Sequence, residues 1–147
     1  MLRITNSLLS EVYVHCESGY PHECCGLLIG TMGEGKTVHA VRRCNNLNME
    51  RARDRYDLDP RDMLKVQREF EDSPWDILGI YHSHPDHPSR PSQTDTDRAW
   101  AGYSYAIISV RNGKAASIQS WVLNESDGGR RFDEEQLVIE DSQESVR

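Results

Sequence analysis

The sequence predicts a single domain of the α/β (α+β) class, in which a mixed β-sheet is flanked by helices. Three observations lead to this prediction. The chain has 147 residues, a length typical of one domain. Apolar residues recur with helical spacing in some segments and form short strand-like runs in others. These segments follow one another without an internal repeat or a low-complexity linker.

The first third of the chain predicts a strand, a helix and a hairpin. Residues 2–5 read as a short strand, and residues 6–19 carry apolar side chains at helical spacing. The run CCGLLIG, residues 24–30, is typical of a buried strand. A glycine-containing turn at residues 31–36 then leads into a second strand at residues 37–44.

The middle third predicts a loop, a helix and the central strand. A polar irregular segment is followed by YDLDP, residues 56–60, which reads as a brief strand. Asp59 is a suitable N-cap with Pro60 at the first helical position, and Ser73-Pro74 should end that helix. The run WDILGIYHSHP, residues 75–85, is the best candidate for the central strand.

The last third predicts a capped helix and a second hairpin. Ser92 is a candidate helix N-cap with Asp95 at the N3 position. Asn112-Gly113 is a strong hairpin signal between two strand-like runs. We expect the main domain to cover residues 1–123. Residues 124–147 would be a C-terminal extension, with one edge strand followed by a frayed acidic tail.

Composition and charge exclude several classes of function. The formal net charge is -7 at pH 7, whereas general nucleic-acid binders carry a basic face. No run of about eighteen apolar residues is present, and the N-terminus does not resemble a signal peptide. We therefore expect a cytoplasmic protein that contacts neither nucleic acid nor membrane. The four cysteines are expected to be small, buried, reduced side chains rather than bridges or ligands.

A possible metal site follows the central strand. His82 and His84 are two residues apart, so in a strand they point to the same face. A proline-rich loop then leads to Asp95 in the first turn of the next helix. Two histidines and one aspartate form a three-ligand set typical of catalytic zinc sites. Alternatively, the histidines are ordinary surface residues and Asp95 only caps its helix; Asp86 and His87 are rival ligands from the loop.

The same residues resemble a known motif. His82-x-His84-Pro85, then Ser92-x-x-Asp95, with an upstream glutamate at Glu23, is similar to the motif of the JAMM/MPN (Mov34/PAD-1) zinc metallopeptidases. Every motif position is filled. The segment NNLNMERARDRYDLDPRDML resembles the small prokaryotic members, so the likeness covers most of residues 1–123. It implies a JAB1/MPN-like fold, with the layered architecture also seen in cytidine deaminases.

The resemblance also implies roles and a substrate. His82, His84 and Asp95 would bind Zn²⁺, Glu23 would be the general base, and Ser92 would stabilise the oxyanion. The activity implied is hydrolysis of a peptide or isopeptide bond at the C-terminus of a ubiquitin-like sulfur-carrier protein with a Gly-Gly tail. The oligomeric state is not indicated.

Other interpretations remain open from the residues themselves. Glu23 could pair with an arginine, and Ser92 could be an N-cap alone. The whole chain could be a non-catalytic MPN-type interaction module, or a two-His-one-carboxylate iron oxygenase. The deaminase signature H-x-E with P-C-x-x-C is absent from the sequence.

Two further groups of side chains bear on binding. Five arginines near the irregular loop form either a solvated face or a docking surface for an acidic partner or a C-terminal carboxylate; they are Arg42, Arg43, Arg51, Arg53 and Arg55. The three tryptophans are expected to be core anchors; they are Trp75, Trp100 and Trp121.

Overall fold

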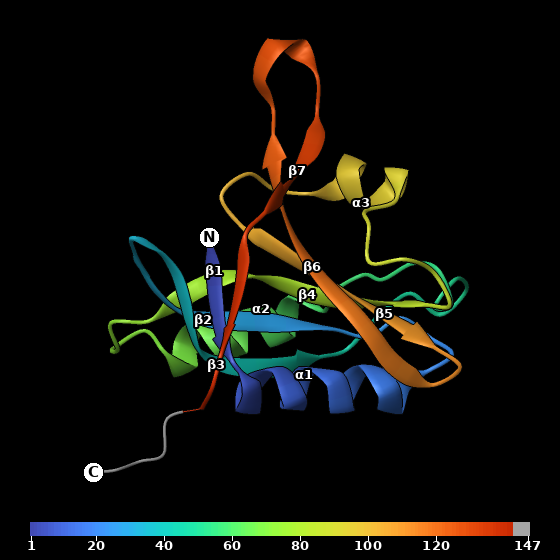
Figure 1. Ribbon diagram of the computed structural model, residues 1–147, viewed down its shortest axis with the longest axis horizontal. Helices are drawn as coiled ribbons and strands as arrows, with labels where there is room; N and C mark the ends of the chain where they lie inside the picture. The colour runs from blue at the N-terminus through green and yellow to red at the C-terminus, as the bar shows by residue number, and fades with distance from the viewer. Residues whose placement is uncertain (143–147) are drawn as a thin grey trace.

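The computed structural model describes residues 1–142 and shows a curled mixed sheet with helices around it (Figure 1). The elements follow one another in the order β1 (Leu2–Thr5), α1 (Asn6–Gly19), β2 (Cys25–Gly33), β3 (Gly35–Cys44), α2 (Pro60–Glu69), β4 (Asp76–Pro85), α3 (Gln93–Arg98), β5 (Ser104–Arg111), β6 (Lys114–Asn124), a 3-10 turn (Ser126–Gly128), β7 (Arg131–Glu135) and β8 (Leu137–Glu140).

The sheet has the strand order β7-β6-β5-β4-β2-β3-β1-β8. Strand β4 is antiparallel to β2 and parallel to β5, so it lies near the middle of the sheet, as predicted. Strand β1 is parallel to β3 and β8, whereas the β2–β3 and β5–β6 pairs are antiparallel hairpins. The predicted class, a single-domain mixed sheet with flanking helices, is confirmed.

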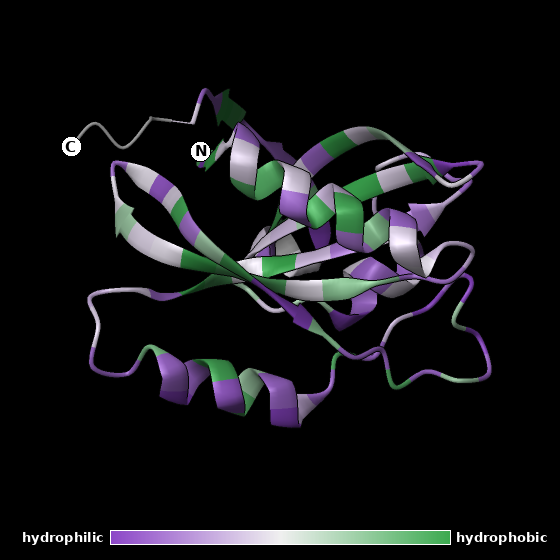
Figure 2. Cartoon of the chain, turned by 90° about the horizontal axis from the view of Figure 1, so that it is seen from below, coloured by the Kyte–Doolittle hydropathy of each residue, from purple (hydrophilic) through white to green (hydrophobic). Residues whose placement is uncertain are grey.

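Each face of the sheet is covered by its own helix, and Figure 2 shows α1 and α2 on opposite sides. Alternate residues of β2 serve the two faces because successive side chains of a strand point in opposite directions. Leu28 belongs to the cluster under α1, together with Leu9 and Val12 of that helix. Leu27 belongs to the other cluster, to which α2 contributes Val66.

Several predicted boundaries are wrong, and each has a local cause. Strands β2 and β3 extend into the expected turn at residues 31–36, because Gly35 has a positive φ of 97° and allows a tight reversal. Residues 56–60 do not form a strand; Leu58 makes an isolated bridge. Helix α2 ends at Glu69, before the expected Ser73-Pro74 stop, and the Ser73 hydroxyl donates to the Phe70 carbonyl.

The segment expected to add one edge strand adds two. Strand β7 pairs with β6 at one end of the sheet, and β8 pairs with β1 at the other. Gln136 alone separates them, so the two ends of the curled sheet must approach each other there. The Gln136 carbonyl accepts a hydrogen bond from the Leu2 amide at 2.9 Å.

A buried polar contact also joins strands across this curl. The Lys36 ammonium of β3 donates to the Ser104 hydroxyl of β5 at 2.8 Å, and that hydroxyl donates to Glu135 of β7 at 2.7 Å. The acidic tail predicted at the C-terminus falls mostly on residues 143–147, which lie outside the described residues. In residues 1–142, no helix has both the length and the apolar character that a membrane crossing requires.

Candidate metal centre

Strand β4 places two imidazoles on one face of the sheet. His82 pairs with Cys25 of β2 and with Ile107 of β5, so a strand flanks it on each side. His84 lies two residues farther along and therefore points to the same face. Their exposed fractions are 0% and 6%, which contradicts the alternative that they are ordinary surface histidines.

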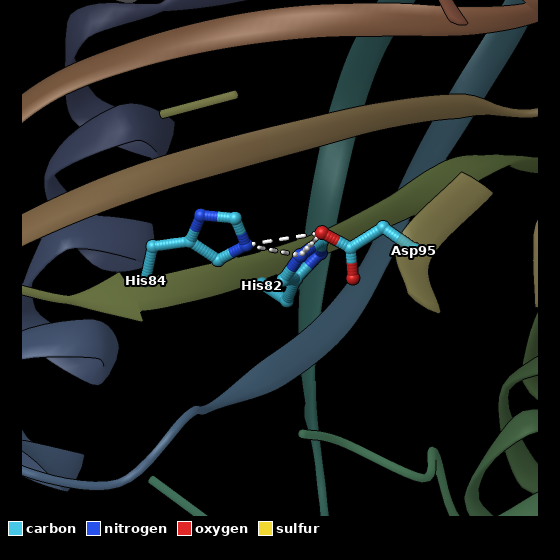
Figure 3. Close-up of side chains that lie close together, drawn as sticks. All are labelled: His82, His84 and Asp95. Atoms are coloured by element: carbon cyan, nitrogen blue, oxygen red, sulfur yellow. Dashed lines mark hydrogen bonds and ion pairs between the residues drawn. The ribbon is translucent and has the colours of Figure 1, made fainter. Parts of the chain in front are cut away.

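Asp95 reaches the same place from the first turn of α3. The Ser92 hydroxyl accepts a hydrogen bond from the Asp95 amide at 3.0 Å, and the Ser92 amide donates to Asp95 Oδ2 at 2.9 Å. This reciprocal capping box was predicted from the spacing, and it fixes the direction of the carboxylate. Figure 3 shows that His82, His84 and Asp95 point toward one another.

The three side chains direct two imidazole nitrogens and one carboxylate oxygen toward one another. The two Nε2 atoms are 3.2 Å apart, and Asp95 Oδ2 lies 3.4 Å from His82 Nε2 and 3.1 Å from His84 Nε2. His84 Nδ1 lies 2.8 Å from the Pro88 carbonyl oxygen. Since a carbonyl can only accept a hydrogen bond, Nδ1 must carry the proton, and the Nε2 atom of neutral His84 therefore has a lone pair. Such a cluster fits a cation, and the three residues form a potential metal-binding group.

The surroundings of His82 and Asp95 favour the protonation states that metal binding requires. Burial lowers the pKa of His82, which favours neutral imidazole at neutral pH. The ring of Tyr56 stacks on His82 with centroids 4.4 Å apart and helps to exclude water. Burial raises the pKa of Asp95, but the adjacent imidazoles and the Ser92 amide outweigh it and hold that pKa below its usual range.

Glu23 lies beside this group, two residues before the start of β2. Because Cys25 pairs with His82 in an antiparallel ladder, Glu23 comes opposite His84 on the same face. Its exposed fraction is 6%, and its Oε1 has no hydrogen-bond partner within residues 1–142. Burial, followed by the charges of Asp95 and Asp54, raises the pKa of Glu23 to about 9.

The loop between β3 and α2 holds Glu23 in position, a role that motif matching did not reveal. The Asn46 amide donates to the carbonyls of both Glu23 and Arg55, at 3.1 and 3.0 Å. The Glu23 amide donates to the Ala52 carbonyl. The sequence signal was the segment NNLNMERARDRYDLDPRDML, in which Tyr56 is the aromatic residue that covers His82.

Two clefts of about 240 Å³ each border the metal-binding group. The first, here the apolar cleft, reaches Asp95 and is lined mainly by Tyr56, Leu58, Met63, Ile80, Trp100 and Tyr105. The second, here the polar cleft, is lined by Glu23, His84 and Ser92 together with Asp54, Arg55, His87, Pro88 and Arg90. The potential ligands therefore have open space on two sides.

The structure separates the other predicted residues from this centre. Asp86 and His87 are exposed and are not part of the potential metal-binding group. Trp75 and Trp121 are partly buried, but Trp100 is 59% exposed beside the apolar cleft, so its prediction as a core anchor is wrong. All four cysteines are buried, as predicted.

Three of the five arginines near the loop lie beside acidic side chains. Arg42 pairs with Glu69 on α2 at 2.6 Å. Arg51 pairs with Asp54 at 2.5 Å, and Arg55 lies 3.8 Å from the same carboxylate. Glu69 therefore balances Arg42, and Arg51 and Arg55 share the single charge of Asp54.

Two imidazoles, one carboxylate and a second, buried carboxylate at a cleft are the functional groups of a metal-dependent hydrolase. A family model described as "Prokaryotic homologs of the JAB domain" matches residues 5–124. The chain belongs to this family, the small prokaryotic branch of the JAMM/MPN hydrolases, and solved JAB1/MPN proteins share its fold.

Named relatives and a solved structure extend this comparison. The desampylase of Haloferax volcanii is 37% identical over 71% of this chain and 74% of its own length. The CysO-cysteine peptidase of Mycobacterium tuberculosis is 31% identical over 82% of each chain. A solution structure of a protein from Desulfitobacterium hafniense has a TM-score of 0.83 at 32% identity, covering 99% of this chain and 97% of that one.

Proposed function

We propose that this protein is a zinc-dependent metallopeptidase that hydrolyses a peptide or isopeptide bond at the C-terminus of a ubiquitin-like sulfur-carrier protein with a Gly-Gly tail. One observation carries the proposal. His82, His84 and Asp95 direct three acceptor atoms at one point, next to a buried glutamate whose Oε1 has no partner in residues 1–142. The two named relatives, a desampylase and a CysO-cysteine peptidase, support this class of substrate.

His82, His84 and Asp95 would hold the zinc ion. When bound there, the ion supplies Lewis acidity, which makes water a better nucleophile and polarises the scissile carbonyl. The fixed hydrogen bonds of His84 to Pro88 and of Asp95 to Ser92 hold two of the three ligand side chains ready. Binding therefore requires little rearrangement of these side chains.

Glu23 performs the proton transfers. Its buried carboxylate accepts a proton from the attacking water and delivers it to the nitrogen of the leaving amine. Burial raises the pKa of Glu23 in the metal-free protein, which makes its carboxylate a stronger proton acceptor, and a cation held by the adjacent ligands would favour the ionised form that this role requires. The hydrogen bonds from the loop fix the backbone of Glu23, and this fixes the point from which the Glu23 side chain extends into the polar cleft.

Ser92 serves both the fold and the reaction. Its hydroxyl oxygen accepts from the Asp95 amide, which leaves its own proton free to donate. Since Ser92 lines the polar cleft with Glu23 and His84, that proton can stabilise the negative charge that develops on the carbonyl oxygen.

A mass measurement tests the proposal. The zinc-loaded protein is incubated with sulfur-carrier proteins that carry short extensions after the Gly-Gly end, and with the same carriers after treatment with a chelator. We expect the carrier to lose the mass of its extension in the first reaction and to remain intact in the second. An unchanged carrier in both reactions, or equal cleavage without metal, would contradict the proposed function.

A further inference from the structure

The direction in which a substrate lies follows from the position of Glu23. The carboxyl group that protonates the leaving amine must come within hydrogen-bond reach of that nitrogen. Glu23 lines the polar cleft and not the apolar cleft. The leaving group therefore lies in the polar cleft, and the carrier tail, on the acyl side, lies toward the apolar cleft beyond Asp95. This step rests on the proposed function.

Arg90 is the free cation of the polar cleft. It is exposed and lines the cleft with Glu23, His84 and Ser92. Within residues 1–142, its side chain makes no hydrogen bond and no ion pair. By contrast, the Arg55 guanidinium donates to the Asp54 carbonyl at 2.9 Å and also lies beside the Asp54 carboxylate.

The backbone of Arg90 is nevertheless held firmly. The preceding residue, Ser89, is 2% exposed; its hydroxyl donates to Gln119 at 2.8 Å, and its carbonyl accepts from the Trp121 ring nitrogen at 3.0 Å. The following residue is Pro91, whose ring restricts the backbone. An unpaired guanidinium thus projects from a fixed point on the wall of the cleft.

The remaining charges leave Arg90 without a compensating acid. Two carboxylates line the polar cleft, Glu23 and Asp54. Asp54 is occupied by Arg51 at 2.5 Å, and Glu23 is the proposed base. His87, the remaining titratable side chain on the rim, is exposed. The cleft therefore has room and positive charge for one anionic group on the leaving side.

We propose that Arg90 binds the α-carboxylate of the leaving residue and is a specificity-determining residue of this enzyme. A guanidinium binds a carboxylate through two parallel hydrogen bonds. A single amino acid released from the carrier tail carries that carboxylate close to its leaving nitrogen. The lysine of an isopeptide bond has none there, because its own carboxyl group is in a peptide bond. The protein therefore favours removal of one C-terminal amino acid over isopeptide cleavage.

Two matched substrates test this inference. A sulfur-carrier protein with one cysteine after Gly-Gly is prepared with a free C-terminal acid and with a C-terminal amide. We expect wild-type kcat/KM to be about tenfold higher for the acid than for the amide. This ratio lies between the effect expected for an exposed ion pair and that expected for a buried charged hydrogen bond. In Arg90→Gln the preference should fall to about one, through loss of activity on the acid alone. Arg68→Gln, an exposed arginine on α2, is the matched control and should keep the preference.

A binding measurement separates recognition from turnover. The acid and the amide are titrated calorimetrically into Glu23→Gln, which should leave both uncleaved, and into the double variant with Arg90→Gln. Tighter binding of the acid in the first protein and equal binding in the second are expected. If wild type cleaves acid and amide equally, or if Arg90→Gln slows both equally, the role of Arg90 is refuted while the proposed function stands. If wild type cleaves neither, the proposed function fails and the inference fails with it.

Discussion

Glu23→Gln should stabilise the metal-free protein while it removes catalysis. The change keeps the size of the side chain and removes its ionisable group. Glu23 is 6% exposed, and burial together with Asp95 and Asp54 raises its pKa from 4.5 to about 9. At pH 7 the carboxyl group is therefore neutral in the folded metal-free protein and ionised in the unfolded chain.

The magnitude follows from the linkage between protonation and folding. Because the folded pKa of Glu23 is above its unfolded pKa, the contribution of Glu23 to stability is fully present below pH 4.5 and is lost as the pH rises toward 9. At pH 7 the loss is at most about 3 kcal/mol. Glutamine does not ionise, so Glu23→Gln should be more stable than wild type by about 1–3 kcal/mol at pH 7. Below pH 4.5 the difference should disappear.

Thermal unfolding of the metal-free proteins at pH 7 and at pH 4 measures this difference. For a domain of this size, about 1–3 kcal/mol corresponds to a rise in Tm of several degrees. Glu71→Gln, which removes an exposed carboxylate on the turn after α2, should leave Tm unchanged. A lower Tm for Glu23→Gln at pH 7, or the same gain at both pH values, would refute the burial argument.

The same Glu23→Gln protein should bind zinc but hydrolyse its substrate about 10²–10⁴-fold more slowly, whereas His82→Ala should lose both activity and zinc. Metal analysis together with turnover measurements distinguishes the two variants. Intact turnover in Glu23→Gln would show that the assignment of Glu23 as the base is wrong. Ser92→Ala should destabilise the fold by about 1 kcal/mol through loss of the α3 cap and slow hydrolysis about 10²-fold. Ser92→Thr, which keeps the hydroxyl group, should retain both stability and activity; denaturation and rate measurements check this. Trp100→Ala should raise KM for the carrier about fivefold, with unfolding free energy changed by less than about 0.5 kcal/mol because the ring is exposed; an unchanged KM would remove the apolar cleft from substrate binding.

Local rules predicted the parts of the site that depend on local geometry. The two-residue spacing of His82 and His84 fixes a common face in any strand. The Ser92–Asp95 spacing fixes a capping box in any helix start, and both appear in the structure. Helix α1, with bounds of Asn6–Gly19, also agrees with the predicted residues 6–19.

The predictions that proved wrong depend on contacts that form only in the folded chain. Residues 56–60 have strand-like residues, but the Asn46 side chain accepts the Asp57 amide at 2.9 Å and takes the place of a ladder partner. Trp100 was expected in the core, but α3 ends at Arg98, and beyond it the Trp100 amide donates to the Tyr105 hydroxyl while the ring stays exposed. The exposure of Trp100 likewise depends on where the chain leaves α3. No spacing rule contains these long-range partners.

The separation of β7 from β8 by Gln136 alone has a consequence for handling of the protein. Residues 131–140 provide the outermost strand at both ends of the sheet, so removal of this segment would uncover β6 and β1 together. Each would then present a row of unpaired amides and carbonyls, which recruit strands from other molecules. A fragment that stops at Asn124 should therefore self-associate, although it retains every proposed zinc ligand and both reacting side chains.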